Sequence, residues 1–323
     1  MIDQYGRRIT YLRVSVTERC NLRCRYCMPE EGIDKKRHDE MLTEDELIMA
    51  IEAAASLGVT KLRITGGEPL VKKNILSICR RAAAVPGIRE LCMTTNGTLL
   101  AGMAPALREA GVNRLNISID TLDAEKYAYI TRRGELADFY SGLEAALAAG
   151  FDKVKLNAVL IGGFNDDEIA PLAELTRRYP VDMRFIELMP IGHGKQLTCV
   201  SNTEVFQKLS DHYGTLLPDP DTHGNGPARY YTVKGFQRSI GFISAIHGKF
   251  CNSCNRIRLT ATGDLKPCLC YQERILVKDA LRSGDTKEAQ KLLAQAIFQK
   301  PAAHCFETLS SITEDAEMSR IGG

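Results

Sequence analysis

The chain has 323 residues, of which 44% are hydrophobic and 25% charged, and these proportions predict a globular protein with one large domain and a smaller one. Lysine and arginine number 42 against 40 aspartate and glutamate residues, a formal charge of +2, which argues against a general surface for nucleic acid or membrane binding. No apolar stretch reaches membrane-spanning length and the start of the chain lacks the apolar core of a signal peptide, so we expect a cytosolic protein.

Short β-rich runs alternate with longer helical patterns over the first two-thirds of the chain. Thr43 and Glu46 have capping-box spacing, and Gly58, Gly111 and Gly150 stand where helix C-caps are expected. Six βα units in series predict a parallel sheet but are too few for a closed eight-unit barrel, so the pattern leaves a partial barrel or a doubly wound sheet. The predicted strands are Leu12–Val16, Lys61–Thr65, Glu90–Thr94, Arg114–Ile119, Val154–Leu160 and Met183–Leu188. The predicted helices are Thr43–Leu57, Asn74–Ala84, Leu99–Ala110, Leu136–Ala149, Asp166–Arg178 and Asn202–His212.

The βα rhythm ends at a turn-rich junction formed by residues 217–220 and 224–227, both rich in proline or glycine. We therefore expect one domain over residues 1–216 and a second over residues 217–323. The second domain has predicted strands at Arg229–Lys234, Ser239–Ala245 and Arg256–Thr260, and helical segments at Ile275–Ser283 and Thr286–Gln299. It ends in Gly322-Gly323.

Eleven cysteines are unusual for a chain expected in a reducing compartment, where metal binding or catalysis explains them better than disulfides. They form two groups and four singletons. We interpret the singletons as structural, and Cys79 and Cys92 lie in apolar segments where a cysteine behaves as a small buried hydrophobe. The first group is Cys20, Cys24 and Cys27; the second is Cys251, Cys254, Cys268 and Cys270; the singletons are Cys79, Cys92, Cys199 and Cys305.

The first group follows directly on the first predicted strand, with gaps of three and then two residues between Cys20, Cys24 and Cys27. A structural zinc site takes four protein ligands, and no fourth Cys or His lies at a suitable distance in the sequence. Three thiolates on a 4Fe–4S cube leave one iron open for a ligand. This C-x3-C-x2-C spacing resembles the signature of the radical S-adenosylmethionine (SAM) superfamily.

Thr65-Gly66-Gly67-Glu68-Pro69 ends the second predicted strand, at the edge where a βα sheet presents its active site. Paired glycines permit a close approach of the backbone, and a strand-end carbonyl or carboxylate accepts hydrogen bonds from an ammonium group. In the radical SAM superfamily the corresponding stretch binds the amino group of SAM. The resemblance therefore implies cofactor-binding roles for Gly66, Gly67 and Glu68.

In the second group, Cys251 and Cys254 are separated by two residues, and Cys268 follows Cys254 after thirteen more. Cys270 is a candidate fourth ligand of a closed zinc or cluster site, and the alternative is a three-cysteine site with a position open for substrate. The spacing does not choose between these two arrangements. His247, four residues before Cys251, is a further candidate neighbour of this group.

Cations recur inside strands that are otherwise rich in Val, Ile and Leu. Such charges are unfavourable unless they are paired or face a polar cavity. The chain has no GxxxxGK[ST] stretch, so a bound triphosphate must be held by side chains, and arginine suits phosphate because its planar fork binds two oxygens. The candidates are Arg13, Arg63, Lys155, Arg184, Arg256 and Arg258.

Longer segments are similar to the MoaA family of GTP 3′,8-cyclases, from Tyr11 to Leu269 and again at the C-terminus. The resemblance implies a partial (β/α)6 TIM-like barrel followed by a C-terminal α+β domain that carries a second 4Fe–4S cluster. It also excludes Cys270 as a ligand, because the family keeps one iron of the second cluster free for the guanine of GTP. The matching segments are YLRVSVTERCNLRCRYC, KLRITGGEPL, TTNG, RLNISIDTL, KVKLNAV, RFIELMPIG, GFIS, FCNSCNRIRLTATGDLKPCL and the terminal Gly-Gly.

The activity that this resemblance implies is the radical SAM cyclisation of GTP to (8S)-3′,8-cyclo-7,8-dihydroguanosine 5′-triphosphate, an early step of molybdopterin cofactor biosynthesis. A 5′-deoxyadenosyl radical removes the ribose C3′ hydrogen, and the substrate radical attacks C8 of the base. The implied cofactors are two 4Fe–4S clusters and SAM, and the C-terminal glycines assist SAM cleavage. The implied partners are GTP, a reductase or flavodoxin-like electron donor and the next enzyme of the pterin pathway, with a homodimer left open.

The resemblance also assigns roles to single positions. It implies that Cys20, Cys24, Cys27, Cys251, Cys254 and Cys268 hold the metals. It places Tyr26, Ser118 and Met189 against SAM, and Arg13, Arg63, Thr94, Lys155, Arg256 and Arg258 against GTP. Cys20, Cys24, Cys27, Arg256 and Arg258 are the expected catalytic residues. Asn96 and Arg184 are placed near the site mainly by their positions at or near strand ends.

Two other interpretations fit the sequence less well. A peptide-modifying radical SAM enzyme usually has a peptide-recognition element or further cysteines near its C-terminus, and neither is evident in the sequence. A non-catalytic iron–sulfur or zinc regulator of nucleic acid is disfavoured by the near-zero net charge and the lack of a helix-turn-helix pattern.

Overall fold

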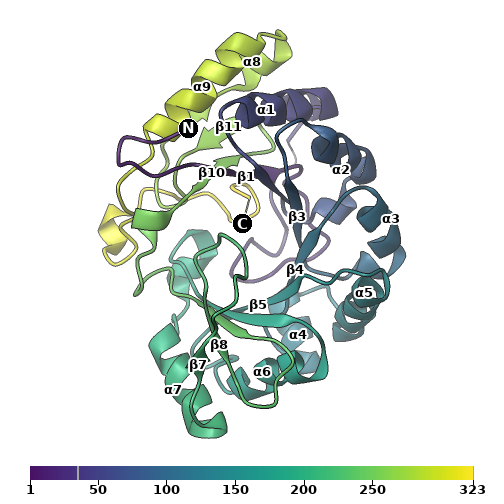
Figure 1. The fold of residues 1–323 in the computed structure, drawn as a ribbon, viewed down its shortest axis with the longest axis vertical. Coiled ribbons are helices and arrows are strands. Elements are labelled where there is room, and N and C mark those ends of the chain that lie inside the picture. The colour runs from purple at the N-terminus through teal and green to yellow at the C-terminus, as the bar shows by residue number, and fades with distance from the viewer. Residues whose placement is uncertain (35, 323) are drawn as a thin grey trace.

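The computed structural model describes residues 1–34 and 36–322. Within these ranges the chain forms a single curved sheet of twelve strands, which Figure 1 shows as an arc with helices along its outer side. Six βα units build the middle of the arc, and the sheet is open at both edges. The fold is therefore a partial (β/α)6 barrel, as predicted. Across the sheet, the strands are β12 (Ile275–Leu276), β11 (Asp264–Lys266), β10 (Arg256–Leu259), β1 (Tyr11–Ser15), β2 (Lys61–Thr65), β3 (Glu90–Thr95), β4 (Arg114–Ser118), β5 (Val154–Leu160), β6 (Asp182–Glu187), β9 (Ile240–Ile243), β8 (Arg229–Thr232) and β7 (Leu217–Pro218).

Strands from the last third of the chain extend the barrel sheet at both of its edges. β10 pairs in parallel with β1 and continues into the antiparallel strands β11 and β12. At the other edge β9 pairs in parallel with β6 and continues into antiparallel β8 and β7. The segment that contains the second cysteine group is thus hydrogen-bonded directly to the first barrel strand. The predicted domain boundary between residues 216 and 217 stays a prediction.

The helices lie where the periodic patterns predict them, with a few differences. The capping box of α1 is formed, since the Thr43 hydroxyl accepts from the Glu46 N–H and the Glu46 carboxylate accepts from the Thr43 N–H at 2.7 Å. Gly58 and Gly111 end α1 and α3 with φ of 92° and 91°, the left-handed region that glycine tolerates best. The α-helices are α1 (Glu44–Ser56), α2 (Ile75–Ala84), α3 (Ala104–Glu109), α4 (Ala124–Thr131), α5 (Leu136–Ala148), α6 (Ile169–Arg178), α7 (Asn202–Tyr213), α8 (Lys278–Arg282) and α9 (Thr286–Phe298). The short 3-10 segments are η1 (His38–Glu40), η2 (Pro69–Val71), η3 (Leu100–Gly102), η4 (Gly192–Gln196), η5 (Cys251–Ser253) and η6 (Leu309–Ser311).

Three helical segments differ from the sequence-based expectation. The predicted helix Leu99–Ala110 is split into η3 and α3, because Pro105 fits only the first turn of a new helix. The predicted helix Ile275–Ser283 begins as strand β12 and becomes helical only at Lys278. Helix α4 follows the β4 strand and was not predicted; its N-cap is Asp123, which accepts from the Lys126 N–H at 2.9 Å.

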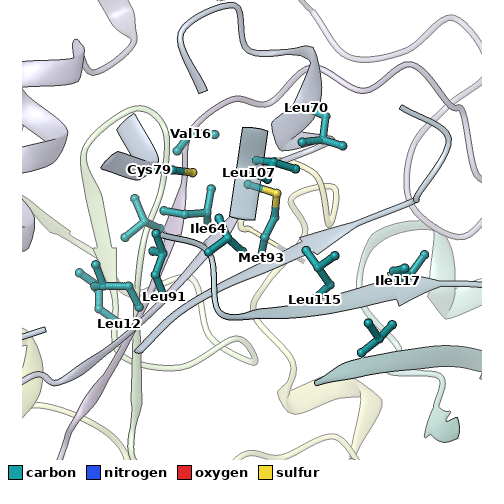
Figure 2. Close-up of a cluster of buried hydrophobic side chains, with 14 of the residues drawn as sticks. Leu12, Val16, Ile64, Leu70, Cys79, Leu91, Met93, Leu107, Leu115 and Ile117 are labelled. Atoms are coloured by element: carbon teal, nitrogen blue, oxygen red, sulfur yellow. The ribbon is translucent and has the colours of Figure 1, made fainter. Parts of the chain in front are cut away.

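The two faces of the sheet differ in chemistry because successive side chains of a strand point to opposite faces. The convex face is apolar and packs against the helices. Figure 2 shows this core, in which strand residues such as Ile64, Met93 and Leu115 meet Cys79 of α2 and Leu107 of α3. These five side chains are fully buried. The predicted structural role of Cys79 fits this position.

The concave face carries the polar residues of the same strands, and the strand register lines them up. Arg13 of β1 lies opposite Arg258 of β10 and Arg63 of β2. Further round the arc, Asn157 of β5 lies opposite Ser118 of β4 and Arg184 of β6. The cations that the sequence places inside strands therefore share one side of the sheet. No helix of the described residues is long and apolar enough to cross a membrane.

Candidate functional site

One cavity of about 390 Å³ occupies the concave side of the sheet. All the metal-binding, cofactor-binding and substrate-binding residues predicted from the sequence line it. Asn96 and Arg184 line it as well. The predicted residues in its wall are Arg13, Cys20, Cys24, Tyr26, Cys27, Arg63, Gly66, Gly67, Glu68, Thr94, Ser118, Lys155, Met189, Cys251, Cys254, Arg256, Arg258 and Cys268.

The loop of the first cysteine group leaves the end of β1 and is fixed by close backbone packing against the glycines after β2. The Gly67 N–H donates to the Thr17 carbonyl and the Glu68 N–H donates to the Arg19 carbonyl, both at 2.8 Å. A Cβ atom on Gly66 or Gly67 would lie 2.5 Å from the Thr17 oxygen or 2.4 Å from the Arg19 oxygen. The paired glycines are thus required by the approach of the cysteine loop, whatever they also contact in a cofactor.

Glu68 organises the same corner of the site from a fully buried position. Its carboxylate accepts from the Leu70 N–H at 3.0 Å, the Thr95 hydroxyl at 2.8 Å and the Asn96 N–H at 2.7 Å. Burial raises the pKa of this carboxyl to about 7, and the hydrogen bonds oppose that rise. Asn96 in turn donates to Asn21 at 2.9 Å and lies 3.9 Å from the Cys20 sulfur, so it braces the cysteine loop.

Asp120 is a site residue that the sequence analysis missed. It follows β4 at the carboxyl end of the sheet, is buried, lines the cavity and accepts from the Tyr26 hydroxyl at 2.7 Å. Burial raises the pKa of its carboxyl to about 6, and the bonds from the Val159 N–H and Tyr26 oppose this. Its position directly after a predicted strand was the signal that could have identified it.

The second cysteine group is assembled from separate parts of the chain. Cys251 begins η5 and Cys254 follows its end, and Cys268 follows β11. The buried Arg7 guanidinium, held by Asp3 at 2.6 Å, donates to the Cys251 carbonyl and the Ala302 carbonyl, both at 2.9 Å. Segments near both ends of the chain therefore hold this group in place. The spacing of the cysteines does not indicate this support.

Cys270 and His247 lie outside the cavity wall. The Cys270 sulfur is fully buried and lies 3.1 Å from the sulfur of Cys305. The His247 ring contacts Glu187, with Nδ1 at 3.1 Å from Oε1. Among the described residues, no three His, Cys, Asp or Glu side chains are grouped for a single metal ion. Each trio, Cys20–Cys24–Cys27 and Cys251–Cys254–Cys268, has the thiol donors that an iron–sulfur cluster takes.

The remaining singleton cysteines also lie outside the cavity wall. Cys92 is fully buried as predicted, but its setting is not apolar, since its sulfur lies 3.3 Å from the Glu90 carboxylate. The reason is its place on β3, where it faces the same side as Arg63. Cys199 is half-buried and pairs through a backbone bridge with Ile161.

Several cations in the wall of the cavity have a lowered pKa. Burial lowers the pKa of Arg13, and the neighbouring Arg258 adds to the effect. Burial together with Arg256 lowers the pKa of Arg258 to about 10, and burial together with Arg184 lowers the pKa of Lys155 to about 7. Each shift means that the charged form is less favourable here than in water. A polyanionic ligand would stabilise the charged forms of these side chains.

Lys155 is held at the amino-terminal end of β5 by a loop whose role the sequence did not reveal. Its ammonium donates to the His223 carbonyl at 2.7 Å and to the Tyr230 hydroxyl at 2.5 Å, and lies 3.3 Å from the Asp182 carboxylate. The His223 ring stacks on Tyr230 with centroids 3.9 Å apart and contacts Asp182 and Asp219 through its two nitrogens. His223 belongs to the turn-rich junction, which carried no functional signal.

The C-terminal tail reaches the concave side of the sheet, and Figure 1 shows the chain ending inside the arc. The Gly322 carbonyl accepts from Arg258 at 2.6 Å and from Arg13 at 3.3 Å. Gly323, the second residue of the predicted Gly-Gly tail, lies outside the described residues.

Comparison with known proteins agrees with this geometry. Residues 14–176 match the radical SAM superfamily, and residues 181–306 match the family described as Molybdenum Cofactor Synthesis C. A GTP 3′,8-cyclase from Pelotomaculum thermopropionicum is 47% identical and one from Moorella thermoacetica is 45% identical, each aligned over 100% of both chains.

A likeness in fold extends to a solved structure, that of Streptococcus suis SuiB bound to S-adenosylmethionine. Its TM-score is 0.62 with 13% sequence identity, over 97% of this chain and 78% of that chain. Membership of the radical SAM superfamily means that the protein is an enzyme that uses a 4Fe–4S cluster and SAM. The chain belongs to the MoaA family of GTP 3′,8-cyclases within that superfamily.

Proposed function

We propose that this protein converts GTP to (8S)-3′,8-cyclo-7,8-dihydroguanosine 5′-triphosphate, an early step of molybdopterin cofactor biosynthesis. The observation that carries the proposal is a single cavity lined by two cysteine trios and by the cationic residues of successive strands. This arrangement supports a SAM-cleaving centre, a second metal centre and a triphosphate-binding surface around one substrate. The sequence relatives named GTP 3′,8-cyclase support the choice of GTP.

The first trio, Cys20, Cys24 and Cys27, would hold the 4Fe–4S cluster that binds SAM. Cys251, Cys254 and Cys268 would hold a second 4Fe–4S cluster. When bound, the first cluster and SAM supply a 5′-deoxyadenosyl radical for abstraction of the ribose C3′ hydrogen. Attack of the C3′ radical on C8 would join the two atoms, and one electron from the reductant with one proton at N7 would complete the dihydroguanosine.

The protein positions SAM with residues around the first trio. Glu68 and the Gly66-Gly67 backbone shape the pocket for its amino group, while Tyr26, Ser118 and Met189 line the adjoining wall. The Glu68 carboxylate already accepts three hydrogen bonds, from Leu70, Thr95 and Asn96. Glu68 therefore acts mainly by fixing the loop after β3 against the cysteine loop.

The triphosphate is held by the cationic wall. Arg13, Arg63 and Lys155 present their charges from three strands, Thr94 adds a hydroxyl, and Arg256 and Arg258 flank the second trio. Binding of phosphate oxygens stabilises the protonated form of each lysine and arginine of this wall and lowers the repulsion between these cations. The Gly322 carbonyl accepts hydrogen bonds from Arg13 and Arg258, so the C-terminal tail lies beside the proposed triphosphate site. We propose that the tail assists SAM cleavage from there.

We place the enzyme in the cytosol, because eleven free cysteines and cluster assembly require a reducing compartment. A reductase or a flavodoxin-like protein would supply electrons, and the next enzyme of the pterin pathway would take the product. A homodimer is compatible with this scheme but is not needed to complete the cavity, which a single chain lines.

Anaerobic incubation of the reduced protein with SAM and GTP tests the proposal, with mass spectrometry and NMR of the nucleotide product. We expect a cyclic dihydroguanosine triphosphate, 5′-deoxyadenosine, and about eight irons per chain from two cubic clusters. An Arg256→Ala variant should bind GTP about 10-fold to 100-fold more weakly, as expected for loss of a charge-assisted phosphate contact. Stoichiometric zinc, or unaltered GTP in the presence of cleaved SAM, would refute the assignment.

A further inference from the structure

His304 occupies a specific place in the cavity that neither the sequence motifs nor the cluster ligands explain. It lies in the segment after α9, is 6% exposed and lines the cavity. Its backbone N–H donates to the Cys251 sulfur at 3.4 Å. Its ring packs between Phe250 and Phe306, with centroids at 6.5 Å and 4.6 Å. The imidazole is therefore held rigidly at the second cysteine trio.

The hydrogen bonding of the ring fixes which nitrogen carries the proton. The Phe306 N–H donates to Nδ1 at 3.3 Å, so Nδ1 is an acceptor. In a neutral imidazole the hydrogen then resides on Nε2. Nε2 is buried and has no hydrogen-bond partner among the described residues. A buried N–H donor without a partner is unfavourable, and the rigid packing prevents the ring from turning away.

The position of His304 indicates what the missing acceptor is. The cations that would hold phosphates extend from Arg256 and Arg258 at the second trio round the strands to Lys155, whereas His304 offers a single N–H donor beside Cys251. We take the base to lie at His304, with the triphosphate directed along the cations. On its major-groove edge guanine offers two neighbouring acceptors, O6 and N7, that a single N–H donor can reach. A donor at this end thus complements the base, and the arginines complement the triphosphate.

We propose that His304 Nε2–H donates a hydrogen bond to the O6/N7 edge of the substrate guanine and is a specificity-determining residue of this enzyme. The inference rests on the proposed function, since it takes GTP as the ligand of the cavity. We therefore expect purine triphosphates without this acceptor edge to bind more weakly than GTP, and we expect the difference to depend on His304. The charged residues of the phosphate wall contribute equally to all these nucleotides, because the triphosphate is unchanged.

Equilibrium binding to the reconstituted full chain tests this, under anaerobic conditions and without SAM so that no turnover occurs. The ligands are GTP, 7-deaza-GTP, which lacks N7, and 2-aminopurine riboside triphosphate, which lacks O6. The proteins are the wild type, His304→Phe and His304→Gln, with His212→Phe as the control because His212 is exposed on α7 outside the cavity wall. Iron content and the cluster spectrum are measured for every variant.

We expect the wild type and the control to prefer GTP over at least one analogue by about tenfold or more, the effect of one buried hydrogen bond. In His304→Phe the same preference should shrink several-fold, and His304→Gln, which keeps an N–H donor, should retain part of it. An unchanged preference in His304→Phe would overturn the inference, including the case in which only the cluster spectrum changes, which would assign the N–H to the cluster. Failure of the wild type to bind GTP would instead overturn the proposed function, and the inference with it.

Discussion

The two cysteine trios differ in how far from the cysteines, in the sequence, the residues that hold them lie. The first lies in one eight-residue loop, braced by the strand ends next to it, Gly66-Gly67 and Asn96. The second needs η5, the end of β11, the N-terminal Arg7 and the segment around Ala302 at once. The first site thus takes its three cysteines from one loop, to which the C-terminal tail adds a bond from the Ser319 backbone to Cys27, whereas the second site draws on segments near both chain ends.

The electrostatic surroundings of the two trios differ as well. Burial raises the pKa of Cys20 to about 11 and that of Cys27 to about 12, and nearby thiols and carboxylates add to the rise. Burial also acts to raise the pKa of Cys254, but Arg256 and Lys300 outweigh it and bring the value to about 7. Burial raises the pKa of Cys251, so the electropositive surroundings are those of Cys254. This difference suits an arrangement in which anionic groups of the substrate lie nearer Cys254 than the first trio.

The strongest test of this separation is Cys24→Ser. Losing a ligand of the first trio should reduce SAM cleavage to background, because the SAM-binding cluster is lost. The second site should stay intact, since none of its supports touches the first loop, and iron should fall from about eight to about four per chain. Reductive cleavage of SAM and the spectrum of the remaining cluster provide the measurement.

Cys199→Ser serves as the matched control, because Cys199 lies outside the cavity wall. It should keep full activity and full iron content. Loss of both clusters in Cys24→Ser would show that the two sites assemble together and would contradict the separation.

Arg7→Ala should have the next largest effect, and on the second site alone. The change removes the guanidinium from Asp3, which keeps only the backbone N–H donors of Tyr5 and residue 7, and from the carbonyls of Cys251 and Ala302. Breaking this buried ion pair should lower the free energy of unfolding by about 3–5 kcal/mol. We expect iron to be lost from the second trio and hydrogen exchange to increase in residues 250–256 and 300–306. SAM cleavage without substrate should persist.

Arg8→Ala is the control for Arg7, since the neighbouring side chain is exposed. It should leave both readouts unchanged. If Arg7→Ala lost the first cluster as readily as the second, the chain ends would support the whole barrel and the contrast would fail.

The same contrast explains how much of the molecule could be predicted from its sequence. The βα rhythm, the first cysteine loop and the strand cations are local or periodic features, and all the predicted site residues line one cavity. Arg7, His223 and His304 act through contacts between distant segments, and no spacing rule connects them to the site. The continuation of the sheet by β10 and β9 was likewise hidden, because short strands do not reveal which edge they join.

Lys155 gives the GTP affinity of the cavity a dependence on pH. Burial and the neighbouring Arg184 lower the pKa of its ammonium to about 7, against the opposing effect of Asp182. Arg114 and Tyr230 also face it. A bound triphosphate raises this pKa, so binding takes up a proton above pH 7. GTP affinity should therefore fall as the pH rises from 7 to 8.5, by up to about tenfold per unit for a single group.

Dissociation constants for GTP from pH 6.5 to 8.5 measure this effect. Lys155→Arg is the matched variant, because guanidinium stays protonated throughout the range, and its profile should be flatter. An identical slope in the two proteins would assign the pH dependence to another group, such as the terminal phosphate itself.

The smallest expected effect is that of Cys270→Ser, and it decides whether the second trio is open. The Cys270 sulfur already contacts Cys305 and accepts from the Cys305 N–H at 3.3 Å, in an apolar cluster with Leu269 and Phe306. A serine hydroxyl can keep these bonds, so we expect unchanged iron content and a loss of stability of about 1–2 kcal/mol from burying the more polar group. Cys268→Ser, two residues away, should lose the second cluster. Equal loss in both variants would make Cys270 a fourth ligand, and a centre saturated by protein would have no iron left to bind the guanine that the cavity is proposed to receive.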